Sequence, residues 1–285
     1  MENSNINHED IIILTIGRMN PPTTGHLLLI KEMIYKAIED NLTQINIILS
    51  HSEDRKKNPF NCDTKKHFLI NDDNNESMTT ILKKQMMDET PENADKIERI
   101  EVKIVCMNDI TNPEYGTNPI MKSIGHILGD YYDYPRKELK IKLIIGEDRI
   151  KSYDWIKKYL NSQEPYPVNM EIIGLSRPEN AMSATEMRNY ALDNDWKTFN
   201  SKMSSTGLDE AVIRNIFDGI IINMKPTSIE EGPSKKRRRR GGRSTRRNSN
   251  RRKVNRRKNT RRNGKKRKAT RRKANIRKST KKTKK

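Results

Sequence analysis

Short apolar runs alternate along the first part of the chain with longer stretches in which apolar residues recur every three or four positions. Five runs are apolar almost throughout, as are strands covered on both faces of a sheet; they are residues 11–16, 45–49, 100–107, 139–146 and 168–175. Helical spacing predicts helices at residues 27–38, 78–87, 119–128, 154–160, 184–193 and 209–224. We therefore predict an α/β fold: a Rossmann-like doubly wound parallel sheet of about five strands, with C-terminal helices.

Charge divides the chain into two parts. Of the 58 basic residues, 30 lie in residues 235–285, which contain none of the 37 acidic ones, so the formal charge is −9 before Lys235 and +30 from there on. From Arg246 the basic part falls into pentads such as RRNSN and RRKVN, a period that matches neither helix nor strand. We predict a flexible leader at 1–10, a globular domain at 11–225 and a disordered polybasic tail at 226–285.

The tail predicts a polyanionic partner. Lysine and arginine displace the counterions of DNA or RNA, and the absence of aromatic residues from 235–285 indicates binding without sequence preference. A nuclear-targeting signal or a solubilising extension is the alternative. Such pentad tails resemble those of proteins from large DNA viruses.

Cys62 and Cys106 are too few and too far apart in the sequence to suggest a disulfide framework. This favours a reducing compartment, the cytoplasm or the nucleus. No apolar run reaches membrane-spanning length, and the acidic leader does not resemble a signal peptide, so we expect no membrane partner.

The first predicted strand runs into the loop Gly17–His26, of sequence GRMNPPTTGH. Gly17 and Gly25 allow backbone to approach a ligand, and Pro21 and Pro22 stiffen the loop. His26 falls in the first turn of a helix, where free N–H groups and the helix dipole favour anions. The loop therefore predicts a phosphate site that lacks the P-loop lysine.

The segment Thr23–His26 also resembles the (H/T)xGH signature of the nucleotidyltransferase superfamily, the cytidylyltransferase-like enzymes. The wider run is most similar to nicotinamide-nucleotide adenylyltransferases. The resemblance implies that His26 donates to the α-phosphate of a bound nucleotide and that Thr23 contacts phosphate or donor beside it. Gly17, Arg18 and Gly25 would then bind the nucleotide. The alternative is a histidine that only caps a helix.

A second motif follows the fifth predicted strand at Met182–Arg188, MSATEMR. Ser183 and Glu186 have the spacing of a capping box, and Thr185 and Arg188 share one face of the helix. The motif resembles the ISxTxxR signature of the same superfamily, with methionine in place of isoleucine. The resemblance implies that Ser183, Thr185 and Arg188 hold the β- and γ-phosphates. The alternative is an ordinary capped helix with a solvated arginine.

Two further segments follow predicted strands. Gly146, Asp148 and Arg149 lie where related enzymes carry a turn near the nucleotide, so they would contact ribose or phosphate, or else Asp148 and Arg149 would only pair with each other. The loop Ser50–Phe60 resembles a loop of related viral and bacterial enzymes. Its Lys56, Lys57 and Asn58 would hold the acceptor phosphate, or would form an ordinary solvated surface.

Together these motifs predict transfer of AMP from ATP to a phosphorylated acceptor, with release of pyrophosphate. Nicotinamide mononucleotide, giving NAD, is the first acceptor to consider. A cytidylyltransferase or a phosphopantetheine-type adenylyltransferase would use the same phosphate machinery. We expect no metal site built by the protein, and Mg²⁺ would arrive with the triphosphate. An alternative of another class is a non-enzymatic nucleic-acid-binding protein on a degenerate scaffold.

Overall fold

The structure is a computed structural model that describes residues 11–54, 56–71, 77–112, 117–129, 139–162, 168–178 and 181–225. Its internal contacts divide the chain after Ser228. The predicted leader at 1–10 and the predicted tail at 226–285 both lie outside the described residues.

Five parallel strands form one sheet in the order β3-β2-β1-β4-β5, which confirms the predicted α/β fold. The strands are β1 (Ile11–Gly17), β2 (Gln44–Leu49), β3 (Glu101–Cys106), β4 (Leu139–Gly146) and β5 (Val168–Leu175). The strand order reverses direction between β1 and β4. Gly17 pairs with Leu49 and Gly146 with Leu175, so the carboxyl ends lie side by side along one edge.

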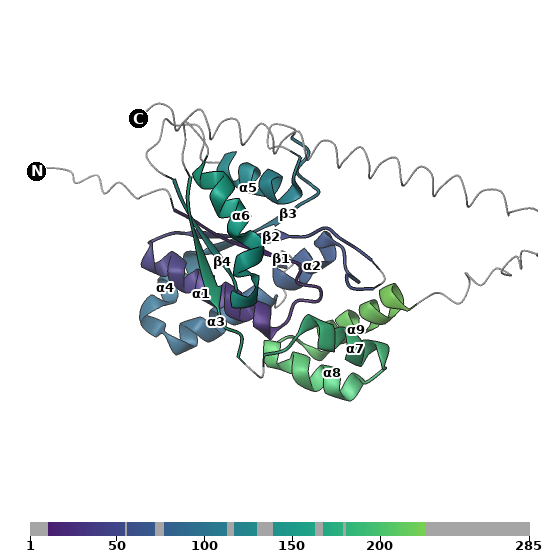
Figure 1. Ribbon diagram of the computed structural model, residues 1–285. Helices are drawn as coiled ribbons and strands as arrows, with labels where there is room; N and C mark the ends of the chain where they lie inside the picture. The colour runs from purple at the N-terminus through teal and green to yellow at the C-terminus, as the bar shows by residue number, and fades with distance from the viewer. Residues whose placement is uncertain are drawn as a thin grey trace, which may run out of the picture. The chain divides into compact units, whose positions relative to one another are not determined.

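The uninterrupted apolar character of β1 is explained by helices on both faces of the sheet. Ile13 packs in one core with α1 (Thr24–Glu39), while Ile12 and Leu14 pack in a second core with α5 (Pro119–Gly129) and α6 (Ile150–Asn161). Successive strand residues point to opposite faces of the sheet. Residues at odd and at even positions are therefore both apolar where both faces are covered. Figure 1 shows α5 and α6 on one side of the sheet, and α1 with α3 (Met78–Glu89) and α4 (Ala94–Arg99) on the other.

The remaining helices form the C-terminal end of the domain. They are α7 (Ala184–Leu192), α8 (Trp196–Met203) and α9 (Glu210–Met224), which pack on one another. Figure 1 shows them grouped beside the carboxyl edge of the sheet. Their aromatic side chains interlock, with the rings of Phe199 and Phe217 5.0 Å apart.

Three helices were not predicted: α2 (Cys62–Leu69), α4 and α8. Each is short, with few apolar positions to set a period. The predicted helix at 154–160 is longer in the structure, because a 3₁₀ turn at Glu147–Arg149 leads directly into α6. No helix in the described part of the chain is long and apolar enough to cross a membrane.

The cysteines correct the prediction made from their spacing. Cys62 and Cys106 form a disulfide, with their Cα atoms 5.9 Å apart. Cys62 begins α2 and Cys106 ends β3, and the fold brings these two positions together although 44 residues separate them. Sequence distance was therefore a poor guide to spatial distance.

Candidate functional site

A cavity of about 300 Å³ opens at the carboxyl edge of the sheet. Residues that follow each of the five strands line it, among them Arg18 after β1, Ser50 after β2, Met107 after β3, Asp148 after β4 and Arg177 after β5. It lies where the strand order reverses between β1 and β4, the usual place for a ligand in an open parallel sheet.

Most of the residues predicted from the motifs meet in this cavity. Its lining includes Gly17, Arg18, Gly25, His26, Lys57, Asn58, Gly146, Asp148, Arg149, Ser183, Thr185 and Arg188. Two predicted residues, Thr23 and Lys56, are not part of the lining.

His26 is held in one orientation by the residue that precedes its helix. Its Nδ1 accepts a hydrogen bond from the backbone N–H of Thr23 at 3.1 Å and lies 2.9 Å from the Thr23 hydroxyl. Since Nδ1 is an acceptor, the ring proton resides on Nε2. Burial, and secondarily the charge of Arg177, lower the pKa of His26 to about 4. His26 is therefore a neutral hydrogen-bond donor at pH 7.

Thr23 differs from the role that the resemblance implied. Its side chain is fully buried, and it contacts His26 and not the cavity. Thr23 is thus a positioning residue: the threonine of the TxGH segment fixes the tautomer and rotamer of its histidine.

Gly25 brings the two motifs into contact. A Cβ atom at this position would lie 3.3 Å from the carbonyl oxygen of Met182, at the start of the second motif, and 3.8 Å from Nε of Arg177. That distance is tighter than most contacts of a real Cβ, so the absence of a side chain lets the α1 start approach the segment before α7. The glycine therefore serves the packing between two loops as well as any ligand.

Arg188 links the second motif to the first. Its Nη1 donates to the backbone carbonyl of Asn20 at 2.5 Å, and its Nη2 donates to Thr185 Oγ1 at 3.0 Å. The shared helix face of Thr185 and Arg188 is thus confirmed. Ser183 and Glu186 form the predicted capping box, with the Ser183 N–H donating to Glu186 Oε2 at 3.1 Å.

Asn20 also lines the cavity, and no pattern in the sequence singled it out. Its side chain is almost fully buried. Its Nδ2 donates to the Phe60 carbonyl at 2.7 Å, and its Oδ1 accepts from the Phe60 N–H at 3.1 Å. With the bond from Arg188, this residue ties together the loops after β1, β2 and β5. No pattern within the sequence indicates partners that lie 40 and 168 residues away.

The loop after β2 is shaped by Asp54. Its carboxylate accepts from the backbone N–H groups of Lys57 at 2.7 Å and Lys56 at 2.8 Å, and these bonds hold the pKa of Asp54 below its usual value. The Asn58 amide also donates to Asp54. The resulting turn presents Lys57 and Asn58 to the cavity and leaves Lys56 outside it.

In the turn after β4, the predicted pairing of Asp148 with Arg149 is present, and both residues also line the cavity. Asp148 and Arg149 form an ion pair with Oδ2 and Nε 3.2 Å apart, and both side chains are largely exposed where they line the cavity. A Cβ at Gly146 would lie 2.8 Å from Asp148 Oδ1, so this glycine makes room for the carboxylate.

The cavity is strongly cationic, although the domain as a whole is acidic. Among the described residues that line it are five permanent cations, against the single carboxylate of Asp148; the cations are Arg18, Lys57, Arg149, Arg177 and Arg188. Burial and the charge of Arg18 lower the pKa of Arg188, as expected where cations gather. Arg177 was not predicted, although a basic residue immediately after a buried strand was an available signal.

Part of the cavity lining is apolar. Leu28 and Leu29 of α1, Met107, Ile120 of α5 and Tyr153 of α6 contribute to it. Leu28 is 42% exposed, which is unusual for a leucine so near the sheet, and Tyr153 is partly buried with its pKa raised by that burial. The lining thus combines cations with apolar and aromatic side chains, a mixture that is usual for small-molecule sites.

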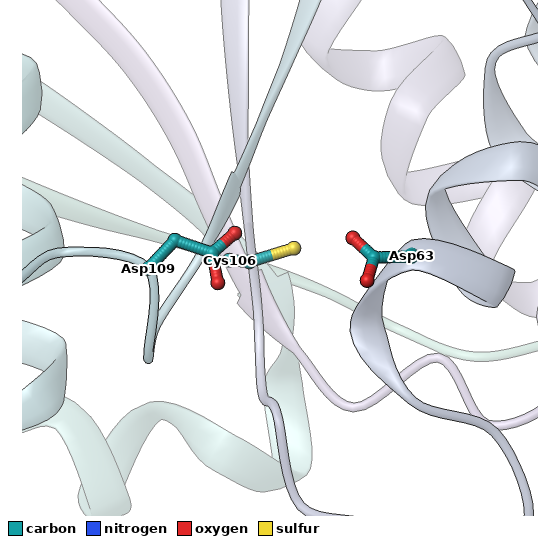
Figure 2. Close-up of side chains that lie close together, drawn as sticks. All are labelled: Asp63, Cys106 and Asp109. Atoms are coloured by element: carbon teal, nitrogen blue, oxygen red, sulfur yellow. The ribbon is translucent and has the colours of Figure 1, made fainter.

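A separate cluster lies outside this lining. Ligand atoms of Asp63, Cys106 and Asp109 all lie within 4.8 Å of one another. Figure 2 shows the Cys106 sulfur between the two carboxylates, with Asp63 approaching from the helix α2. Because this sulfur is bonded to Cys62, it is not a free ligand in the oxidised protein.

No model of a known protein family matches the chain, and no curated protein matches it significantly.

Proposed function

We propose that the protein transfers AMP from ATP to a small phosphorylated acceptor and releases pyrophosphate. The observation that carries this proposal is the convergence of two helix starts, those of α1 and α7, with five cations on one cavity at the switch point of the sheet. Such a site suits several phosphates in a row, because helix N-termini and arginines both favour anions.

In this proposal, His26 and Arg188 contact different phosphates of ATP. The neutral Nε2–H of His26 donates to the α-phosphate, where charge develops as an acceptor oxygen attacks phosphorus. Arg188, with Thr185, binds the β- and γ-phosphates, which depart as pyrophosphate. One P–O bond forms to the acceptor and the bond between the α-phosphorus and the bridging oxygen breaks, so no covalent bond to the protein is needed. Mg²⁺ enters as part of the metal–nucleotide substrate.

Arg177 and Arg18 place additional positive charge near His26 and Arg188, respectively. Arg177 lies close enough to His26 to depress its pKa, and Arg18 acts in the same way on Arg188. Both are exposed, so their charges are available to a ligand in the cavity. Bound phosphates would relieve the repulsion among these cations, which favours binding of the substrate with the most negative charge.

For the acceptor we propose nicotinamide mononucleotide, with Lys57 and Asn58 near its phosphate and apolar lining residues beside its ring. Cytidylyl transfer and phosphopantetheine adenylylation would use the same phosphate-binding residues. The shape of the cavity would decide which base and which acceptor bind. The proposed setting is the cytoplasm or the nucleus, which the cysteines no longer support because Cys62 and Cys106 are joined in a disulfide. There the tail, residues 235–285, would bind DNA or RNA by charge.

A substrate panel tests this proposal. ATP and CTP are each incubated with nicotinamide mononucleotide, phosphopantetheine or choline phosphate, and pyrophosphate release is measured. We expect release with ATP and nicotinamide mononucleotide, with NAD as the second product. Release with another pair would support nucleotidyl transfer but would show that the substrates are different ones. No release from any pair would remove the enzymatic proposal and favour a nucleic-acid-binding protein on an inactive scaffold.

A further inference from the structure

We propose that Cys62, Asp63, Cys106 and Asp109 form a binding site for a thiophilic divalent cation, Zn²⁺ in the first place, when the disulfide is reduced. The four residues come from two elements. Cys62 and Asp63 open α2, and Cys106 ends β3 with Asp109 in the turn that follows.

The geometry already gathers the donor atoms. The sulfur of Cys106 and one oxygen each of Asp63 and Asp109 lie within 4.8 Å of one another, as Figure 2 shows. The sulfur of Cys62 is bonded to that of Cys106 and so belongs to the same place. The disulfide must open by only about 1.5–2 Å to give the spacing of two sulfurs on a tetrahedral zinc ion, whose Zn–S bonds are about 2.3 Å.

The two carboxylates are exposed, and Asp63 lies in the first turn of α2. Within the described part of the chain, neither Asp63 nor Asp109 has an ion-pair or side-chain hydrogen-bond partner. Opening the disulfide would place two thiols beside two carboxylates, and a divalent cation would bind the sulfurs as thiolates and offset the negative charge of the set. A set of two sulfurs and two oxygens favours Zn²⁺ over Mg²⁺ or Ca²⁺, which prefer oxygen alone.

The required chemistry balances with a phosphine as reductant. The phosphine gives two electrons to the disulfide and becomes a phosphine oxide with the oxygen of water, and each sulfur gains a proton. Binding of Zn²⁺ then displaces both thiol protons to the solvent. The metal would replace the disulfide as the link between α2 and β3, and so would keep the loop with Lys57 and Asn58 anchored. This inference does not depend on the proposed transferase activity.

The full-length protein is reduced with tris(2-carboxyethyl)phosphine, freed of reductant, and titrated with Zn²⁺ and separately with Co²⁺. We expect one metal ion per reduced chain by native mass spectrometry, and none on the oxidised chain. Cobalt should produce thiolate-to-metal absorption in the near ultraviolet. Residues 235–285 contain no cysteine, histidine or carboxylate side chain, so the tail supplies no competing ligand.

Variants separate this site from adventitious binding. Cys62→Ser with Cys106→Ser should abolish metal binding. Asp63→Asn with Asp109→Asn should weaken it by about tenfold or more, whereas the exposed Asp88→Asn should not. The proposal is overturned by a reduced wild-type chain that binds no zinc or gives no thiolate–cobalt absorption, by metal retained in the double serine variant, or by a disulfide that resists the phosphine in the folded protein. Because the cobalt spectrum is read on wild-type protein, poor folding of a variant leaves the test decisive.

Discussion

Arg188 donates a hydrogen bond of 2.5 Å to the backbone carbonyl of Asn20, across 168 residues of chain. The same asparagine exchanges two hydrogen bonds with the backbone of Phe60. One buried residue, through its backbone carbonyl and its side chain, therefore sets the spacing between the loops that would hold the nucleotide and the acceptor. Contacts between the two motifs and the loop after β2 preorganise the site.

Asn20→Ala should destabilise the fold and widen the cavity. The change leaves the N–H and carbonyl of Phe60 without partners in a buried place, at a cost of about 1–3 kcal/mol for each group. We expect the free energy of unfolding, measured by urea denaturation, to fall by about 2 kcal/mol or more. Asn223→Ala is the matched control, since Asn223 makes one hydrogen bond to the same loop, at Pro59. Equal losses in the two variants would contradict the central role of Asn20.

Arg188→Ala should weaken binding of ATP about tenfold or more, because a charge-assisted contact to phosphate is lost together with the anchor at Asn20. Arg188→Lys should restore only part of the affinity, since an ammonium cannot reach the Asn20 carbonyl, Thr185 and phosphate in the same geometry. Isothermal titration calorimetry measures both. Arg214→Ala serves as the control, as Arg214 pairs with Asp218 on the surface of α9. Similar affinities for the two alanine variants would exclude Arg188 from the phosphate site.

The low pKa of His26 predicts a specific acid sensitivity. Its pKa is lowered from 6.5 to about 4 in the folded protein, so below pH 6.5 the unfolded chain binds the proton more readily than the folded one. Stability associated with neutral His26 is complete above pH 6.5 and is lost as the pH falls towards 4. A shift of this size corresponds to at most about 3 kcal/mol.

His26→Gln should therefore flatten the dependence of unfolding free energy on pH between 6.5 and 4. The exposed His67→Gln is the control for the loss of one imidazole. Denaturant titrations at several pH values give the comparison. A wild-type slope that persists in His26→Gln would show that the histidine is not buried in its neutral form.

The domain and the tail should carry separate functions, catalysis and DNA binding respectively. We expect a chain that ends at Gly232 to keep pyrophosphate release within about twofold and to lose binding to a random DNA duplex at low salt. The full chain should lose that binding steeply as salt increases, because counterion release drives it. DNA binding retained by the shorter chain would place a nucleic-acid site on the domain itself.

The strands and both motifs were predictable because their signals are local. Strands buried on both faces appear as unbroken apolar runs, and β4 and β5 match the predicted bounds residue for residue. Ser183 and Glu186 carry their capping box within four residues. The convergence of the motifs followed from topology, since the first comes directly after β1 and the second a short loop after β5.

The features that the sequence did not predict depend on contacts between residues that are distant in the chain. The short helix α2 has a mixed sequence, CDTKKHFL, whose buried face includes Lys65, which donates to the Ser50 carbonyl. No periodicity rule places a lysine in a core. The disulfide and the inward role of Thr23 were missed for the same reason: each is decided by what the folded chain puts beside the residue.

The measurement that tests the central claim most directly is pyrophosphate release by wild type and His26→Ala with ATP and nicotinamide mononucleotide at saturating concentrations. The account predicts release by wild type and a loss of about 10²-fold or more in kcat for the variant, with ATP affinity changed little, because the histidine acts on charge that develops during transfer. Equal rates for the two proteins would contradict the assignment of His26, and absence of release by wild type with every triphosphate and acceptor would contradict the account as a whole.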